Sequence, residues 1–216
     1  MPATKKVVRI DPIDMRVLDF KIEGTAPLGI SRFSYKAQQA IESNQEAGST
    51  AASRKTRVAR DFEADYIAAR YVSEEGWYGI NAAAFRNGMI SVCKSTGFMM
   101  TRAKLALFIE ADGKDATDQT PLVRIYGEPQ MWRAPARNAN GSFDIRCRAR
   151  WPKWKMRVRV HFDAGVYTDS DVTNLMMRLG VLAGVGEGRP DSKEGPGIGM
   201  GTFCLLPGDA TLEVAA

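Results

Sequence analysis

Histidine is almost missing from this chain. Among 216 residues the only one is His161, so neither a histidine-rich metal site nor a histidine-based catalytic dyad is indicated, and we expect no cofactor. The cysteines are few, odd in number and widely separated. Each lies in an apolar pattern, which predicts buried thiols and argues against disulfides and zinc ligands. They are Cys93, Cys147 and Cys204.

Long apolar runs are also lacking. No run of about 18 apolar residues could span a bilayer, and the first residues, MPATKKVVRIDPIDM, have no apolar core like that of a signal peptide. We therefore expect a cytoplasmic protein with no membrane segment. The length of 216 residues fits one domain with insertions, or one domain plus a small lobe.

Acidic residues are scarce in one part of the chain. Between Trp132 and Arg159 there are nine Lys or Arg residues but only one carboxylate, that of Asp144. A solvated face usually mixes both signs, and this local excess matters more than the net charge of +5 for attracting a polyanion. The alternative is a basic face that only keeps the protein soluble. We favour nucleic-acid binding.

The same region alternates with a period of two. Residues 143–151 and 154–162 each place apolar side chains on one side and mostly cations on the other, which predicts two half-buried strands. Like charges that face each other destabilise a sheet, so a cationic face predicts a phosphate backbone as its ligand. The cations of this face are Arg146, Arg148, Arg150, Lys153, Lys155, Arg157 and Arg159.

The expected elements follow the order strand, insertion, helix, strand, strand, helix, strand. This order predicts an α+β fold with a ferredoxin-like (RRM-like) βαββαβ core and a long insertion between the first strand and the first helix. In chain order we expect a strand at Met15–Gly24, helices at Asp61–Tyr71 and Asn81–Thr96, a strand at Leu122–Tyr126, the two basic strands, a helix at about Asp169–Ala183 and a strand at Gly201–Leu206.

Two of these helices have recognisable ends. For the helix at Asn81–Thr96, Asn81 is the expected N-cap and Gly97 is expected to end the helix. Ser170 or Asp171 is expected to cap the helix at about Asp169–Ala183, whose apolar stripe includes Leu182.

The chain divides into an expected arm at residues 1–14, one domain at 15–206 and a tail at 207–216. Within the domain, the insertion spans 25–80 and a Gly-rich loop spans 184–201. The segment Ser43–Arg57 is small, polar and without periodicity. It is either a surface loop or a basic finger that a ligand orders.

The Gly-rich loop reads GVGEGRPDSKEGPGIGMG. Such a run lets backbone amides approach a ligand or adopts left-handed turns without steric penalty. The spacing of Gly184, Gly186 and Gly188 imitates a dinucleotide-binding fingerprint, but the run follows an expected helix and precedes a strand, the reverse of a Rossmann loop. No Gly-Lys-Ser or Gly-Lys-Thr indicates a Walker loop. The structural alternative is a mobile lid.

A ferredoxin-like chain whose second helix runs into a Gly-rich loop and then a last strand resembles the repeat-associated mysterious proteins, the RAMP superfamily of CRISPR effector complexes. The segment Tyr78–Arg86, YGINAAAFR, is similar to the family's entry into its first helix. The likeness covers Met15–Leu206 and is strongest to the backbone subunits that coat a guide RNA. Phage and mobile-element proteins are similar too. The resemblance implies phosphate contacts by Ser31, Arg32, Arg86 and Arg189.

The function that these features favour is non-catalytic binding of single-stranded nucleic acid, either RNA or ssDNA. Head-to-tail copies would form a homo-oligomer or filament along the strand, and the resemblance implies other effector-complex subunits as further partners. Trp132 is the best candidate for base stacking, since Trp151 and Trp154 fall on the apolar side of the strands. Further expected contacts are Arg54, Lys55, Arg57, Arg133, Arg137 and Lys193.

Two other functions stay open. A RAMP-type nuclease would use His161, although cationic neighbours would keep it neutral, or a metal held by Asp61 and Asp65, which share a helix face. Ordinary helix-surface acids are the simpler explanation of that pair. Alternatively, the chain is a protein-interaction or decoy module related to the CRISPR backbone subunits.

Overall fold

The fold is mixed α+β, as the sequence predicts. The computed structural model describes residues 12–32, 61–137, 143–192, 197–212 and 214. Its elements are β1 Met15–Gly24, β2 Leu28–Ile30, α2 Phe62–Ala68, β3 Tyr71–Val72, β4 Tyr78–Asn81, α3 Ala83–Thr96, α4 Met100–Ala106, β5 Leu107–Glu110, β6 Gly113–Lys114, β7 Pro121–Tyr126, β8 Gln130–Arg137, β9 Phe143–Trp151, β10 Lys155–Asp163, α5 Asp169–Arg178, the π-helical turn η1 Leu179–Ala183, and β11 Phe203–Leu205.

The larger of two antiparallel sheets is built around β10. Within the described residues it has eight strands in the order β11-β1-β10-β7-β4-β3, with β5 paired to β10 and β6 to β7. One edge of β10 pairs with β1 over nine residues, and its other edge is shared by β7 and β5. All of these pairings are antiparallel. We call this the main sheet.

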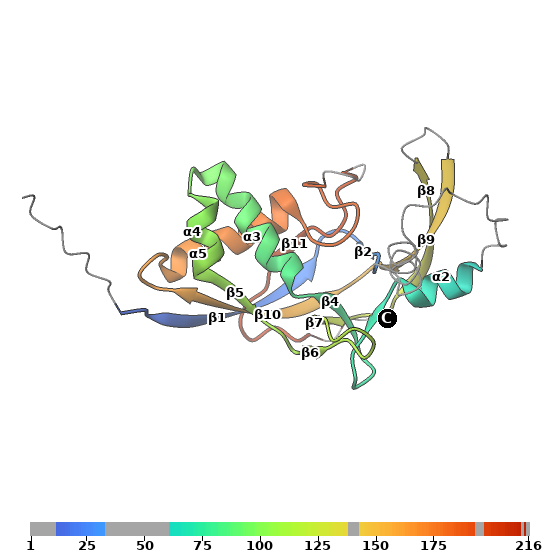
Figure 1. The fold of residues 1–216 in the computed structure, drawn as a ribbon, viewed down its shortest axis with the longest axis horizontal. Helices are drawn as coiled ribbons and strands as arrows, with labels where there is room; N and C mark the ends of the chain where they lie inside the picture. The colour runs from blue at the N-terminus through green and yellow to red at the C-terminus, as the bar shows by residue number, and fades with distance from the viewer. Residues whose placement is uncertain (1–11, 33–60, 138–142, 193–196, 213, 215–216) are drawn as a thin grey trace, which may run out of the picture.

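Helices α3, α4 and α5 cover one face of the main sheet (Figure 1). Apolar residues of these helices, such as Phe85 and Met176, are fully buried there, and so are alternate residues of β10, such as Val158 and Phe162. Burial of each such side chain contributes roughly 1.5–3 kcal/mol. In the part of the chain that the structure describes, no helix covers the other face (Figure 1), which we call the outer face.

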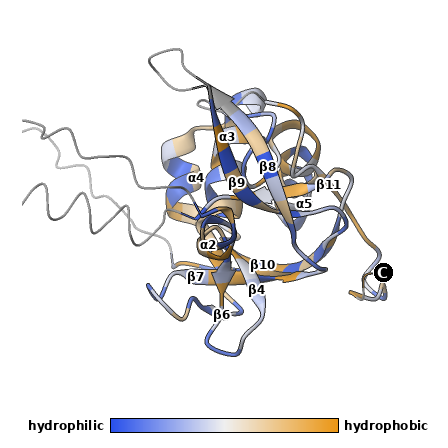
Figure 2. Cartoon of the chain, turned by 90° about the vertical axis from the view of Figure 1, so that its right-hand side faces the viewer, coloured by the Kyte–Doolittle hydropathy of each residue, from blue (hydrophilic) through white to orange (hydrophobic). Residues whose placement is uncertain are grey.

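A smaller sheet of order β2-β9-β8 lies at one end of the molecule, together with α2 (Figure 2). The chain passes from β9 of this sheet into β10 of the main sheet through a short turn. Trp151 and Trp154 flank the turn and are 0% and 1% exposed, which confirms the prediction that both belong to the core. The two basic strands are confirmed, but they lie in different sheets, so their cations do not share one face.

Helix ends were predicted in part. The N-cap of α3 is Ala82, one residue after the predicted Asn81, whose side chain still accepts a hydrogen bond from the backbone N–H of Ala83 at 2.8 Å. Gly97 ends α3 as predicted, with φ of 73°. The predicted cap of α5 is wrong. Thr168 is the N-cap, in a capping box with Asp171. Leu182 is 50% exposed, contrary to prediction, because the π-helical turn η1 shifts the side-chain register of the helix by one residue per turn.

Three further expectations are corrected. Strand β8 was not among the expected elements, and its Pro135 is accommodated because β8 is an edge strand. Ile145 is 52% exposed although the alternation places it on the apolar side. Cys204 is exposed, whereas Cys93 and Cys147 are buried free thiols. The segment Ser43–Arg57 and residues 1–11 of the expected arm lie outside the described residues.

Candidate nucleic-acid interface

Ion pairs cover the outer face of the main sheet where a bare cationic surface was predicted. Arg157 of β10 binds Asp19 of the neighbouring strand β1 through Nε at 2.8 Å and Nη2 at 2.5 Å. The contact is diagonal, because the residue directly opposite Asp19 is Arg159. These hydrogen bonds lower the pKa of the Asp19 carboxyl. Arg159 binds Asp112 at 2.8 Å and Glu110 at 3.2 Å.

Two lysines of this face also have partners. Lys155 lies 3.7 Å from Glu23 and donates to the carbonyl of Thr211. Lys21 donates to the carbonyls of two tail residues, Gly208 and Ala210, at 2.5 and 2.9 Å. The C-terminal tail therefore contacts the same face as the cations.

His161 also has a carboxylate neighbour. Its Nε2 lies 2.6 Å from an oxygen of Glu110, and this hydrogen bond lowers the pKa of Glu110. The expected purely cationic surroundings of His161 are therefore wrong. The sequence count missed the acids because they come from β1, β5 and the segment after β5, far from residues 132–159 along the chain.

The arginines of β9 lie on a different surface, one face of the smaller sheet. Directly opposed residues of antiparallel strands share a face, and β9 pairs Arg146, Arg148 and Arg150 with Ala134, Trp132 and Gln130 of β8. We call the surface formed by the following residues the Arg–Trp face: Gln130, Trp132, Arg146, Arg148 and Arg150.

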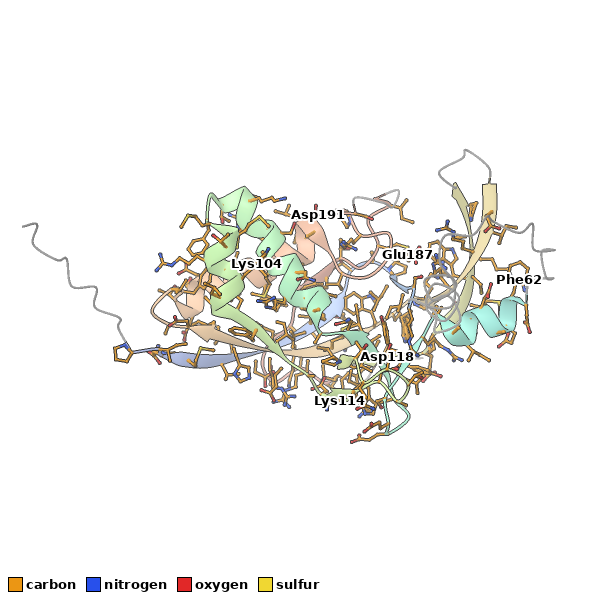
Figure 3. The ribbon with its side chains drawn as sticks, viewed as in Figure 1. Phe62, Lys104, Lys114, Asp118, Glu187 and Asp191 are labelled. Atoms are coloured by element: carbon orange, nitrogen blue, oxygen red, sulfur yellow. The ribbon has the colours of Figure 1, made fainter. Side chains whose placement is uncertain are left out.

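Helix α2 packs on the opposite face of this sheet. The guanidinium of Arg133, the neighbour of Trp132 in β8, lies 4.6 Å from the centre of the Phe62 ring, and Cys147 of β9 is buried on that side. Figure 3 shows Phe62 of α2 and Glu187 of the Gly-rich loop on either side of β9. The Arg–Trp face thus looks toward the Gly-rich loop, and Arg133 belongs to the α2 side.

Arg148 and Arg150 differ in the partners of their guanidinium groups. Arg148 is paired with Glu187 at 2.5 Å and its side chain is 15% exposed. Arg150 is half-buried, and its Nε is buried with no hydrogen-bond partner among the described residues. A buried donor without a partner costs about 1–3 kcal/mol. This Nε is shielded from solvent, so a ligand would contact only the accessible part of the half-buried Arg150 side chain.

Trp132 stands beside the point where the Gly-rich loop meets the sheet. An atom added at the Cβ position of Gly29 would lie 3.7 Å from the indole ring of Trp132 and 3.2 Å from the carbonyl oxygen of Glu187. The N–H of Glu187 donates to the carbonyl of Gly29 at 2.8 Å. Trp132 itself is half-buried, so part of its ring remains accessible.

The glycines that the structure describes in the loop are required by its backbone. Gly184, Gly186, Gly188, Gly197, Gly199 and Gly201 all have positive φ, which other residues rarely adopt. A Cβ on Gly201 would also collide with the carbonyl of Val185. Backbone geometry thus accounts for this composition, and the loop's contribution to the Arg–Trp face is Glu187. Arg189 donates to the carbonyl of Gly186 at 3.0 Å.

Two arginines expected to contact phosphates form ion pairs or hydrogen bonds within the fold. The side chain of Arg32 is 10% exposed and pairs with Asp115, which is 0% exposed, at 2.8 Å and with Asp118 at 3.0 Å. Burial opposes ionisation of Asp118, but hydrogen bonds with Thr120 and the Arg32 pair outweigh it and lower its pKa to about 2. The guanidinium of Arg32 is therefore already paired with two carboxylates.

Arg86 donates to the carbonyl of Leu107 at 2.8 Å and to that of Lys104. It ties α3 to the junction of α4 and β5. Among the other expected residues, Ser31 and Lys153 are exposed and Arg137 belongs to β8. The following lie outside the described residues: Arg54, Lys55, Arg57 and Lys193.

One of the two acids considered for a nuclease, Asp61, has a structural role. Asp61 is the N-cap of α2 and accepts hydrogen bonds from the N–H groups of Glu63 and Ala64 at 3.0 and 3.1 Å. Over the described ranges, no group of three or more His, Cys, Asp or Glu side chains could hold a metal ion. In the same ranges, no helix has the length and apolar character needed to cross a membrane.

Comparison of the chain with protein-family models and with curated protein sequences gives no match.

Proposed function

We propose that this protein binds single-stranded nucleic acid, RNA or ssDNA, through the Arg–Trp face. The observation that carries the proposal is that the half-buried Arg150 lies on the same sheet face as the partly accessible Trp132. A phosphate oxygen would pair with the accessible part of the guanidinium, and a base would stack on the indole. Stacking of this kind contributes about 1–3 kcal/mol per base.

Arg148 adds a second cation whose charge is already opposed by Glu187. A phosphate at Arg148 would have to displace this carboxylate, so we assign Arg150 the larger contribution. Contacts of these types read the backbone and the flat faces of bases, so little sequence preference is expected.

We further propose that the helical half of the molecule is a ferredoxin-like core with a RAMP-like arrangement. The supporting observation is the strand order β11-β1-β10-β5, in which neighbours are antiparallel. In chain order, α3 lies between β1 and β5, and α5 lies between β10 and β11, as in a split βαβ repeat. On this proposal, β2, α2, β3 and β4 belong to the insertion that precedes α3.

The test is fluorescence anisotropy with labelled 40-mers of single-stranded RNA and DNA, each titrated at 50 and 200 mM salt. We expect binding to at least one of them that weakens steeply with salt, since phosphate contacts release counterions. Light scattering after size exclusion, with the same strands, tests head-to-tail coating as a stepwise increase in mass. Absence of binding at low salt would refute the proposal and favour the protein-interaction module. Cleavage of labelled RNA in the presence of magnesium would favour the nuclease.

A further inference from the structure

Among the described residues, no strand lies beside one edge of β1 over the first half of its length. β11 pairs only with Ile22, Glu23 and Gly24. The carbonyl of Asp14 accepts from Ala164 after β10, whereas that of Lys21 accepts from Leu206 on the other side. Even-numbered residues therefore direct their backbone groups toward β10, and odd-numbered ones direct theirs to the open edge.

Met15, Val17 and Asp19 consequently have backbone N–H and C=O groups with no strand beside them in the described chain. Proteins normally pair, cover or charge such an edge, because it is a template for another strand. Here the side chains do not protect it. Ile13, Met15 and Val17 are 69%, 42% and 50% exposed, and alternate residues lie on one face, so they form an apolar stripe along the edge.

The sequence around Met15 is complementary to itself when reversed. If two copies of β1 pair antiparallel about Met15, Ile13 of each copy lies opposite Val17 of the other. Asp14 of each copy then lies opposite Arg16 of the other, so two pairs of opposite charges form across the interface. These two residues now form an ion pair within the chain at 2.8 Å, and their side chains are 54% and 57% exposed, so both are accessible to a partner.

Neighbouring registers lack this match. Pairing about Arg16 would place that arginine opposite its own copy, and like charges so placed are destabilising. Pairing about Val17 would place Met15 opposite Asp19 and Ile13 opposite Lys21, each an apolar side chain against a charge. The only proline nearby, Pro12, is even-numbered, so it removes no donor from the open edge.

We propose that two copies of this protein associate through their β1 edges, antiparallel and centred on Met15. Three facing pairs of residues would form about six backbone hydrogen bonds, two for each pair. A contact of this kind is isologous and closes in a dimer. It is independent of the proposed function, since the free part of β1 and the Arg–Trp face lie at opposite ends of the molecule (Figure 1).

The first test measures the mass of the full chain by sedimentation equilibrium without nucleic acid. We expect a concentration-dependent doubling of the mass. Arg16→Asp should abolish it, because two aspartates would then face each other in each pair, and the combined Asp14→Arg, Arg16→Asp variant should restore it. A wild-type chain that stays monomeric at all concentrations would overturn the proposal, as would a double variant that is folded but monomeric.

A cysteine test fixes the register. In a Cys204→Ser background, Met15→Cys should cross-link on oxidation, since facing Cα atoms of a hydrogen-bonded pair are about 5.5 Å apart, within the range of a disulfide. Val17→Cys is the matched control, similarly exposed on the same stripe, but about 13 Å from its own counterpart along the strands. Cross-linking of Val17→Cys in place of Met15→Cys would refute the register centred on Met15.

Discussion

Arg150 and Arg157 provide a direct test of which surface binds nucleic acid. Both follow the same alternating pattern in the sequence, and the sequence alone predicts the same role for both. In the structure, Arg157 is held by Asp19, whereas Nε of Arg150 is buried without a partner in the described residues. We therefore expect Arg150→Gln to weaken binding. Arg157→Gln should leave Kd unchanged within about twofold, which corresponds to about 0.4 kcal/mol of binding free energy.

The size of the effect follows from the contact that is lost. A hydrogen bond to a charged group contributes about 1.5 kcal/mol at the low end, which corresponds to about a tenfold higher Kd for Arg150→Gln. Loss of one phosphate contact on a single strand lowers the slope of log K against log salt by about 0.7. The penalty should therefore shrink by about 2.6-fold between 50 and 200 mM salt.

The assay is the same anisotropy titration, with thermal unfolding as the control for folding. Arg157→Gln removes an exposed ion pair with side chains 46% and 41% exposed, so it should cost at most about 1 kcal/mol of unfolding free energy. If Arg157→Gln reduces affinity and salt slope as much as Arg150→Gln does, the outer face of the main sheet takes part and our assignment of the interface is wrong.

Three further predictions concern Trp132, the Gly-rich loop and Arg32. Trp132→Ala should raise Kd by about 5- to 150-fold, equivalent to about 1–3 kcal/mol of stacking, and abolish any quenching of fluorescence that depends on this indole; unchanged affinity would remove it from the interface. Gly201→Ala, which creates a backbone clash at φ of 69°, should lower the melting temperature more than Gly199→Ala, which has φ of 79° and open space around it; equal effects would mean that the clash is relieved. Arg32→Ala should destabilise the fold by about 3 kcal/mol, because it leaves buried Asp115 without its cation, while the folded fraction binds normally. A selective loss of affinity would instead support the phosphate contact that the resemblance implies.

Local pattern was sufficient to predict most of the elements. Alternation identified β1, β9 and β10, and a terminal glycine located the end of α3, whose N-cap lies one residue after the expected one. These signals depend on residues that are neighbours in sequence. The cap of α5 was missed by a few residues, since Thr168 precedes three equally suitable polar residues, Asp169, Ser170 and Asp171.

The candidate site was harder to predict because it depends on distant pairing. The sequence count correctly found few acids near Arg157, but Asp19 is 138 positions away in the chain. Likewise, Glu187 reaches Arg148 from the Gly-rich loop. The division of the basic region between two sheets depends on the buried turn at Trp151 and Trp154, which in the sequence only appears as a restart of the alternation.

The ion pairs of the outer face also bear on how quickly a polyanion would find this protein. Two opposite charges a few ångströms apart, such as Arg157 and Asp19, act as a small dipole, whose field decays faster with distance than that of a single charge. Fields of exposed charges are further screened over about 8 Å at physiological ionic strength. This face should therefore contribute little to electrostatic steering. An approaching strand would be drawn toward cations whose charge is less completely matched, and Arg150 would favour encounters at the end of the molecule formed by the smaller sheet.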